Sequence, residues 1–269
     1  MFTRTTLIAA AVFLTPMAAA EPLAPGQWGG SFSIGADFPV GGDVHGGAVA
    51  PVASLAALNP NLPAASAELR IQSRSFDDIY GEALTYSLEA TRGLTGDREV
   101  FATIGRTEAS EGRVQVGTAF VPALSASLPV FGKFGDYNAT SFEVGVRQYF
   151  GETGGVRPYV AGRIGAARTD EIRASFTVPV PNGVGTEPND IALNNVPFYA
   201  DNTAVTVGVD VGLSYAASDR LVLSVETGLR YTGDLDGDDS AIGGLGLGGI
   251  NNTGARTSVP IRVRARLAF

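Results

Sequence analysis

The sequence predicts an all-β fold, an eight-stranded antiparallel up-and-down transmembrane β-barrel with short turns at one end and long loops at the other. Three observations predict it. Segments of about ten residues alternate between apolar and polar side chains, as a barrel wall between lipid and lumen requires. The connections alternate between short and long, and the final segment has one apolar and one strongly cationic face.

The start of the chain has the layout of a secretory signal peptide. A short basic start ends at Arg4, an apolar run covers residues 7–14, and small residues at 18–20 offer a cleavage site before Glu21. A membrane anchor, the alternative, needs about 20 apolar residues, and this run is much shorter. The expected organisation is a cleaved signal peptide over residues 1–20 and one barrel domain over residues 21–269.

The composition narrows the classes of function. Removing residues 1–20 from the 269 leaves 249, enough for one large all-β domain or two small ones. The chain has no cysteine, which excludes disulfides and thiolate metal sites. Losing Arg4 reduces 19 basic residues to 18 against 27 acidic ones, and the resulting net charge of −9 argues against nucleic acid as a partner. Lys133 is the only lysine, and arginine tolerates burial in ion pairs better than lysine.

The first four predicted strands alternate with period 2, which sends successive side chains to opposite faces of a sheet. In the first, mostly apolar residues occupy the even positions from Trp28 to Phe38. The third is ambiguous, because Val100 on one side and Phe101 on the other are both apolar. The four strands cover residues 27–38, 82–93, 98–107 and 140–150.

The last four predicted strands alternate more regularly. In the sixth, Val205, Val207, Val209 and Val211 are separated only by small or polar residues. In the eighth, aliphatic residues lie opposite three arginines at alternate positions, so the three must share one environment. The four strands cover residues 156–168, 205–215, 220–231 and 259–269.

The connections predict the topology. Three are tight turns rich in Gly, Asp and Ser, over residues 94–97, 151–155 and 216–219. Four are long, over residues 39–81, 108–139, 169–202 and 232–258. Transmembrane barrels combine short periplasmic turns with long extracellular loops, and a chain that starts and ends on one side needs an even number of strands. The structural alternative is a soluble periplasmic β-sandwich, in which short and long connections would not be expected to alternate so regularly.

The terminal strand resembles the closing strand of Gram-negative outer-membrane β-barrels, because residues 259–269 alternate in polarity and end in Phe269. The resemblance covers essentially all of the mature chain, and it is to small surface-antigen barrels of the OmpA-membrane-domain-like or OmpX-like kind. It implies an outer-membrane location and a monomer in contact with outer-membrane lipid. It also implies that the barrel-assembly machinery recognises the C-terminal strand.

Aromatic residues at the ends of four predicted strands predict a girdle at one membrane interface, because amphipathic rings favour the headgroup boundary. In a soluble sandwich they would be ordinary core aromatics. The girdle residues are Trp28, Phe150, Tyr215 and Phe269.

The inward faces predict a polar network in the lumen. We expect forked ion pairs, because an unpaired buried charge costs several kcal/mol. A barrel of about eight strands is just wide enough for side chains to fill, which favours a plug. The excess of arginine leaves open a narrow anion-preferring passage. The network residues are Glu89, Glu143, Arg147, Arg163, Asp210, Glu226, Arg230, Arg262, Arg264 and Arg266.

Motifs in the long loops have plain interpretations. His45 is the only histidine and has no other metal ligand spaced to join it, so we expect a solvated side chain, followed by a short apolar helix within residues 48–58. An acidic segment resembles half of a calcium loop, but Asp239 replaces the turn glycine and Leu245 the bidentate acid. We expect a hydrated tip there, and a flexible loop over residues 243–249.

Two loops also contain strand-like segments, residues 113–121 and 171–180. As extensions of neighbouring strands, they would raise β-structure above the membrane. If residues 113–121 and 130–134 crossed the membrane instead, the strand count would be ten. Pro122 and Pro129 bound these stretches and favour the extension.

The sequence thus predicts a non-enzymatic function, envelope structure or surface interaction through four long loops. A narrow small-solute or anion channel is the main alternative. A lipid-modifying enzyme has less support, because it needs a nucleophile and a base held together on the wall, and no Ser-His pair lies on a predicted strand. No catalytic residue, cofactor or metal site is predicted.

Overall fold

Eight long strands close into a barrel in the computed structural model, which describes residues 22–152 and 155–269. The strands are β1 Trp28–Gly41, β6 Ala83–Thr95, β7 Arg98–Ala109, β10 Tyr137–Tyr149, β11 Val156–Thr169, β14 Asn202–Ala216, β15 Leu221–Thr232 and β16 Arg256–Ala268. The order around the wall is β1, β16, β15, β14, β11, β10, β7 and β6, with every neighbouring pair antiparallel and β6 pairing with β1 to close it. The predicted fold class is confirmed, whereas the predicted signal peptide lies outside the described residues.

The pairing of β7 with β6 resolves the ambiguous third strand. Thr103 lies opposite Glu89, so the odd-numbered side chains of β7 face inward with it. Glu99, Phe101 and Thr103 are buried, and Ile104 on the other face is exposed. The lumen therefore receives an acid, an aromatic ring and a hydroxyl from this strand.

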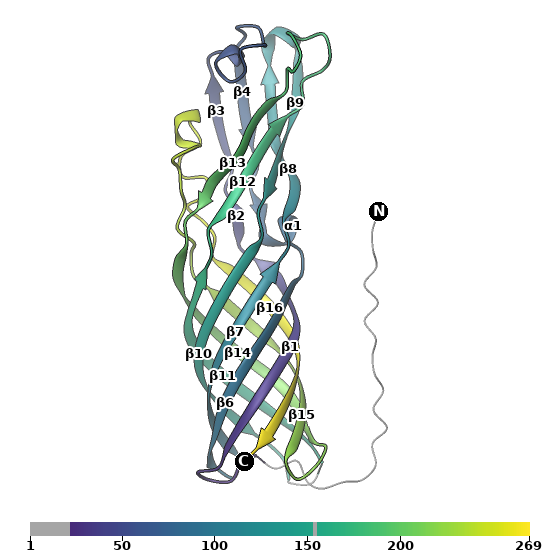
Figure 1. The fold of residues 1–269 in the computed structure, drawn as a ribbon, viewed down its shortest axis with the longest axis vertical. Coiled ribbons are helices and arrows are strands. Elements are labelled where there is room, and N and C mark those ends of the chain that lie inside the picture. The colour runs from purple at the N-terminus through teal and green to yellow at the C-terminus, as the bar shows by residue number, and fades with distance from the viewer. Residues whose placement is uncertain (1–21, 153–154) are drawn as a thin grey trace.

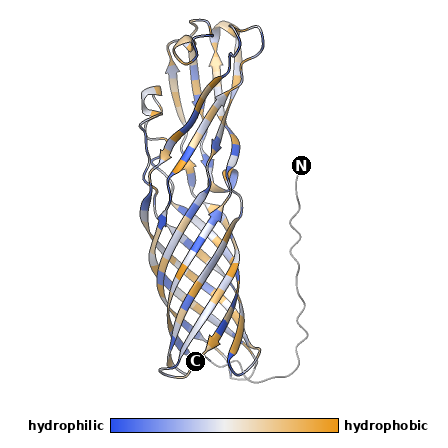
Figure 2. Cartoon of the chain, in the orientation of Figure 1, coloured by the Kyte–Doolittle hydropathy of each residue, from blue (hydrophilic) through white to orange (hydrophobic). Residues whose placement is uncertain are grey.

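The outer face of the barrel is apolar around its circumference. Figure 2 shows apolar residues alternating with more polar ones along the barrel strands. On β14, for example, Val205 and Val209 are each 60% exposed, while Thr206 and Asp210 between them are buried. Within the described ranges, the strongly exposed large apolar side chains lie on or beside the barrel strands, apart from Val49 and Leu124. A protein folded in water rarely displays so continuous an apolar surface.

A second sheet, which we call the upper sheet, continues the wall beyond the end of the barrel opposite the C-terminus (Figure 1). Its strands, in spatial order, are β13 Ile191–Tyr199, β12 Ile172–Val178, β9 Ala126–Phe134, β8 Gly112–Val121, β4 Ala67–Ile71 and β3 Ala48–Val52. The strand-like loop segments are thus extensions, as predicted, and the barrel has eight strands rather than ten. The β8–β9 hairpin turns at the short 3-10 helix η2, Pro122–Leu124.

Short elements connect the upper sheet to the barrel rim. β2, Asp43–His45, pairs with β5, Arg74–Ser75. The short helix α1, Phe76–Ile79, directly follows β5 in the chain. Ser75 caps this helix, accepting from the amide of Asp78 while the Asp78 carboxylate accepts from the Ser75 amide. Phe76 is thereby buried between the rim and the upper sheet.

The loops differ from expectation in three places. Within residues 48–58 the expected short helix is only the 3-10 helix η1 (Leu55–Ala57), and residues 48–52 form β3, in which Ala50 and Val52 alternate inward as strand residues. His45 is 1% exposed rather than solvated, since aromatic rings enclose it. Residues 243–249 contain the 3-10 helix η3 (Gly243–Leu245), and Leu247 anchors them in the apolar core. Across residues 22–152 and 155–269, no helix combines the length and apolar character needed to cross a membrane.

Candidate functional site: the charged lumen of the barrel

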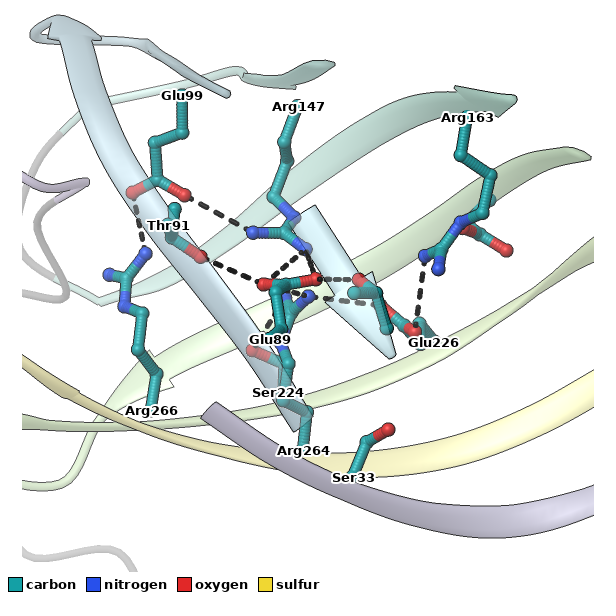
Figure 3. A network of polar contacts seen from close by, with 12 residues as sticks. Ser33, Glu89, Thr91, Glu99, Arg147, Arg163, Ser224, Glu226, Arg264 and Arg266 are labelled. Atoms are coloured by element: carbon teal, nitrogen blue, oxygen red, sulfur yellow. Dashed lines mark hydrogen bonds and ion pairs between the residues drawn. The ribbon is translucent and has the colours of Figure 1, made fainter. Parts of the chain in front are cut away.

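The lumen network begins near the C-terminal end of the barrel, where Arg147 lies between two carboxylates (Figure 3). Its Nη2 is 3.0 Å from Glu89 Oε2, and its Nη1 is 3.2 Å from Glu99 Oε2. The guanidinium of Arg266 binds the other oxygen of Glu99, and Thr91 donates to Glu89. Both carboxylates therefore have charge-assisted partners on each oxygen.

The next layer pairs Arg264 of β16 with Glu226 of β15. Arg264 Nη1 lies 3.3 Å from Glu226 Oε2 and 3.5 Å from Glu89 Oε1, so it links this layer to the one below. The Tyr159 hydroxyl donates to Glu226 Oε2 at 2.7 Å and accepts from Arg264 Nη2 at 3.1 Å. The Tyr159 hydroxyl thus gives Glu226 and Arg264 further hydrogen bonds beside the ion pair between them.

The third layer contains three arginines and two further acids. Arg163 Nε donates to Asp210 Oδ2 at 2.7 Å, and Arg262 Nη2 reaches Asp210 Oδ1 at 3.1 Å. Arg230 Nη1 donates to Glu143 Oε1 at 2.9 Å, and Arg163 reaches the other oxygen of Glu143 at 3.3 Å. Glu143 is shared by two arginines and Asp210 by three. Arg163 and Arg262 also reach Glu226, which connects this layer to the one before it.

All ten residues predicted for the network lie in this lumen, and no more than 9% of any of them is exposed. Sequence reasoning missed Glu99, which raises the buried acids from four to five against six arginines. Its signal was present, because Glu99 has the same parity as Phe101 and Thr103, but apolar residues on both faces of β7 concealed it. Near charge balance is what a water-excluded interior requires.

Aromatic rings fill the space between the charges. The guanidinium carbons of Arg147 and Arg163 lie 4.8 and 5.0 Å from the centre of the Phe101 ring, within the range of cation–π attraction. A Cβ at Gly145 would collide with this ring, and one at Gly212 would collide with Tyr159. Glycine at these two inward positions therefore makes room for large side chains opposite.

Buried side chains lie at both ends of the lumen. At the lower end, Leu23 is buried and its amide donates to Glu99 Oε1 at 2.8 Å. At the upper end, Arg256 pairs with Asp37 at 2.8 Å and lies 5.1 Å from the centre of the Tyr137 ring. Between Arg256 and the third layer lies a polar cavity of about 50 Å³, room for little more than ordered water.

The four predicted girdle residues all lie at one end of the barrel. Trp28 opens β1, Tyr215 is the penultimate residue of β14, and Phe150 and Phe269 directly follow β10 and β16. Trp28 and Phe150 are about half exposed, Phe269 is mostly exposed, and Tyr215 is half-buried. The guanidinium of Arg92 stacks on the Trp28 ring at 5.7 Å.

The network offers little reactive chemistry. In the part of the chain that the structure describes, no group of three His, Cys, Asp or Glu side chains is arranged to hold a metal ion. Asp239, from the acidic loop segment, accepts a hydrogen bond from the amide of Gly249 at 2.9 Å. The lumen carboxylates accept from arginines and hydroxyls, so the arrangement is suited to holding strands together.

Comparison with known proteins gives structural likeness only. No protein-family model matches the chain, and no curated protein matches its sequence. Among solved structures, the chain is similar to Neisserial surface protein A, with 14% identity, 90% of this chain and 97% of that chain covered, and a TM-score of 0.40. It is similar to Ail of Yersinia pestis with 13% identity, 91% of this chain and 100% of that chain covered, and a TM-score of 0.37. It is similar to the outer-membrane protease OmpT of Escherichia coli with 10% identity, 92% of this chain and 98% of that chain covered, and a TM-score of 0.39.

Proposed function

We propose that the protein is an integral outer-membrane β-barrel with a sealed lumen, and that it presents the upper sheet on the cell surface for structural or surface-interaction purposes. The proposed function is non-enzymatic. We also propose that the protein is exported with removal of residues 1–20 and forms a monomeric barrel in contact with outer-membrane lipid. The barrel-assembly machinery would recognise β16.

The lipid-facing surface supports the membrane location. The outward side chains of the barrel are predominantly Val, Leu, Ile and Phe, while the upper sheet buries its apolar side chains in a core of its own. A transmembrane barrel has such an apolar band on its outer wall only, with aromatic residues at the interfaces. Trp28, Phe150, Tyr215 and Phe269 would form the girdle at the periplasmic end.

The single observation that carries the sealed lumen is the burial of the connected network. Arg147 and Glu99 have no solvent-exposed surface, and the lumen arginines share carboxylates from one layer to the next. An ion passing through would have to break several buried ion pairs, each costly to leave unpaired. We therefore prefer the plug over the anion passage.

Lys133 provides a test of orientation, because it is the only lysine in the chain and lies on β9 of the upper sheet. Its side chain is 52% exposed, and its ion pair with Glu111 is equally open to solvent. An amine-reactive reagent that cannot pass the outer membrane should label Lys133 in intact cells. The N-terminal amine of the mature chain comes two residues before Leu23, which lies at the opposite end of the barrel, so it should react only after lysis.

The matched control is Lys133→Arg, which keeps the charge and removes the reactive amine. It should abolish labelling of intact cells and leave the protein in the outer-membrane fraction with heat-dependent migration on SDS gels. Labelling of Lys133 only after lysis, or extraction of the protein by carbonate, would contradict the proposed location and orientation.

A further inference from the structure

The upper sheet encloses an apolar cavity of about 180 Å³ that lies outside the charged lumen. The sheet is not closed, because β3 and β13 are its two edges, and residues from the segment 241–250 line the cavity together with residues of both edge strands. Side chains from every strand of the sheet line the space, among them Leu69, Val116, Phe176 and Leu193. A dry apolar cavity of about 150 Å³ is large enough to bind benzene, so this one can hold a small organic molecule.

His45 is the polar residue in this otherwise apolar lining. It is 1% exposed, and its ring stacks on Phe134 with centroids 5.7 Å apart and meets Phe198 edge to face at 6.3 Å. Two aromatic side chains therefore hold the imidazole in one orientation at the wall of the cavity.

The hydrogen bonds of His45 define its tautomer. Nδ1 lies 3.0 Å from the carbonyl oxygen of Gly46, which can only accept, so Nδ1 carries the proton. Burial lowers the pKa of His45 below its usual value, which keeps the ring neutral. Nε2 is then an acceptor with an unshared lone pair, and it is buried with no hydrogen-bond partner among the described residues. Such an atom is costly to leave unsatisfied.

We propose that this cavity binds one small apolar molecule that carries a hydroxyl group. The hydrocarbon body lies among the aliphatic side chains, and the hydroxyl donates to Nε2 of His45. The chemistry selects a donor, because a neutral imidazole whose Nδ1 is already bonded to Gly46 offers only a lone pair. This binding site is separate from the lumen network and goes beyond the surface role proposed above.

The ligand enters past the wall segment over residues 241–250, which belongs to no strand of the upper sheet. Near its ends, the Gly46 amide donates to the Ile250 carbonyl oxygen at 2.6 Å, and the amide of Asp238, three residues before the segment, donates to the Phe198 carbonyl oxygen at 3.0 Å. No strand ladder joins it to β3 or β13. A ligand can therefore enter without breaking the ladders of the upper sheet.

Cyclohexanol and cyclohexanone form a matched pair of probes, because they share size and shape and only the alcohol donates a hydrogen bond. The mature chain, carrying a tag without histidine, would be placed in lipid nanodiscs with ¹⁵N-labelled histidine. His45 is the only histidine, so the spectrum reports Nε2 directly. We expect saturable binding of cyclohexanol that shifts the Nε2 signal, and binding about tenfold weaker for cyclohexanone with no such shift.

Two variants separate the hydrogen bond from the cavity. His45→Phe keeps a ring against Phe134 and should reduce cyclohexanol binding about tenfold, to the level of cyclohexanone. Ala119→Leu, which places bulk in the cavity wall, should weaken both probes alike. Heat-dependent gel migration would show that each variant is folded. Equal affinity for the two probes, an unmoved Nε2 signal at saturation, or no saturable binding in the folded protein would overturn the proposal.

Discussion

At the scale of single residues, the guanidinium of Arg147 shows what the lumen demands of its side chains. It lies between Glu89 and Glu99, and the three side chains are between 0% and 5% exposed. Their attraction offsets the cost of removing them from water only while all three are present. Removing the shared cation would leave two buried anions.

Substituting Arg147→Met should therefore lower the free energy of unfolding by about 3–5 kcal/mol, as measured by urea titration of the barrel in lipid vesicles. Arg70→Met is the matched control, because Arg70 pairs with Glu68 at 2.6 Å on the exposed face of β4. An exposed pair contributes about 1 kcal/mol or less. Equal losses for the two variants would show that the lumen network is not a buried structural network.

His45 should make the stability of the upper sheet dependent on pH. Desolvation lowers its folded-state pKa below the ordinary 6.5, outweighing the bond to Gly46 and the nearby Asp43 and Asp78, which raise it, while Arg74 lowers it further. Protons then bind the unfolded chain more readily, so the His45 contribution is complete above pH 6.5 and is lost as the pH falls toward the lowered value.

The measurement is the urea midpoint of the upper sheet, followed by amide signals of β8 and β9, between about pH 7.5 and pH 5. The midpoint should fall with pH in the wild type and change much less in His45→Phe. A variant that retains the full pH dependence would assign it to the carboxylates around His45 instead.

The environment of a single residue could be predicted from the sequence where apolar and polar side chains alternate regularly along a strand. It could not be predicted where both faces of the strand are apolar or where residues from distant strands enclose the side chain. The arginines of β16 were assigned to the lumen because aliphatic residues separate them. Glu99 was missed because β7 is apolar on both faces, and His45 was expected in solvent because the enclosing Phe134 and Phe198 come from distant strands.

At the scale of elements, β14 shows why the barrel strands could be predicted within a few residues of their ends. Its valines face outward and its Asp210 faces inward, so each side chain has one of two opposite environments. Strands of the upper sheet lack this contrast. In β13, Asn195 has a positive φ of 50° and the pairing with β12 shifts register there, which breaks the alternation that sequence reasoning needs.

The outward face of β14 should be sensitive to charge. Val209 lies at the middle of the strand and is 60% exposed, so Val209→Arg should destabilise the inserted barrel by about 2–4 kcal/mol. Val49→Arg is the control, because Val49 is 66% exposed on β3 of the upper sheet, outside the proposed membrane span. It should change the unfolding free energy by less than about 0.5 kcal/mol. The same measurement in vesicles tests both, and a tolerated arginine at Val209 would place that face in water.

At the scale of the whole molecule, the barrel and the upper sheet above it distribute apolar and polar side chains in opposite ways. The barrel has an apolar exterior and a charged interior, whereas the upper sheet has a mainly polar exterior and an apolar core. The barrel could be predicted from the sequence because its apolar exterior and charged interior leave a period-2 pattern of polarity over about ten residues in each strand. The sequence also predicted β-structure in the long loops, but not the sheet order or the enclosed cavity, which depend on contacts between four separate loops.

We propose a barrel that spans a membrane with a closed lumen, and conductance across a planar lipid bilayer tests this closure most directly. With Arg147, Glu89 and Glu99 paired and the Leu23 amide bonded to Glu99 at the lower end, we expect no steady current from the wild-type protein at either polarity. Arg264→Glu, which reverses one charge of the network, gives the comparison. Steady anion-selective conductance of the wild type that is lost in Arg264→Glu would contradict the sealed lumen and establish a passage instead.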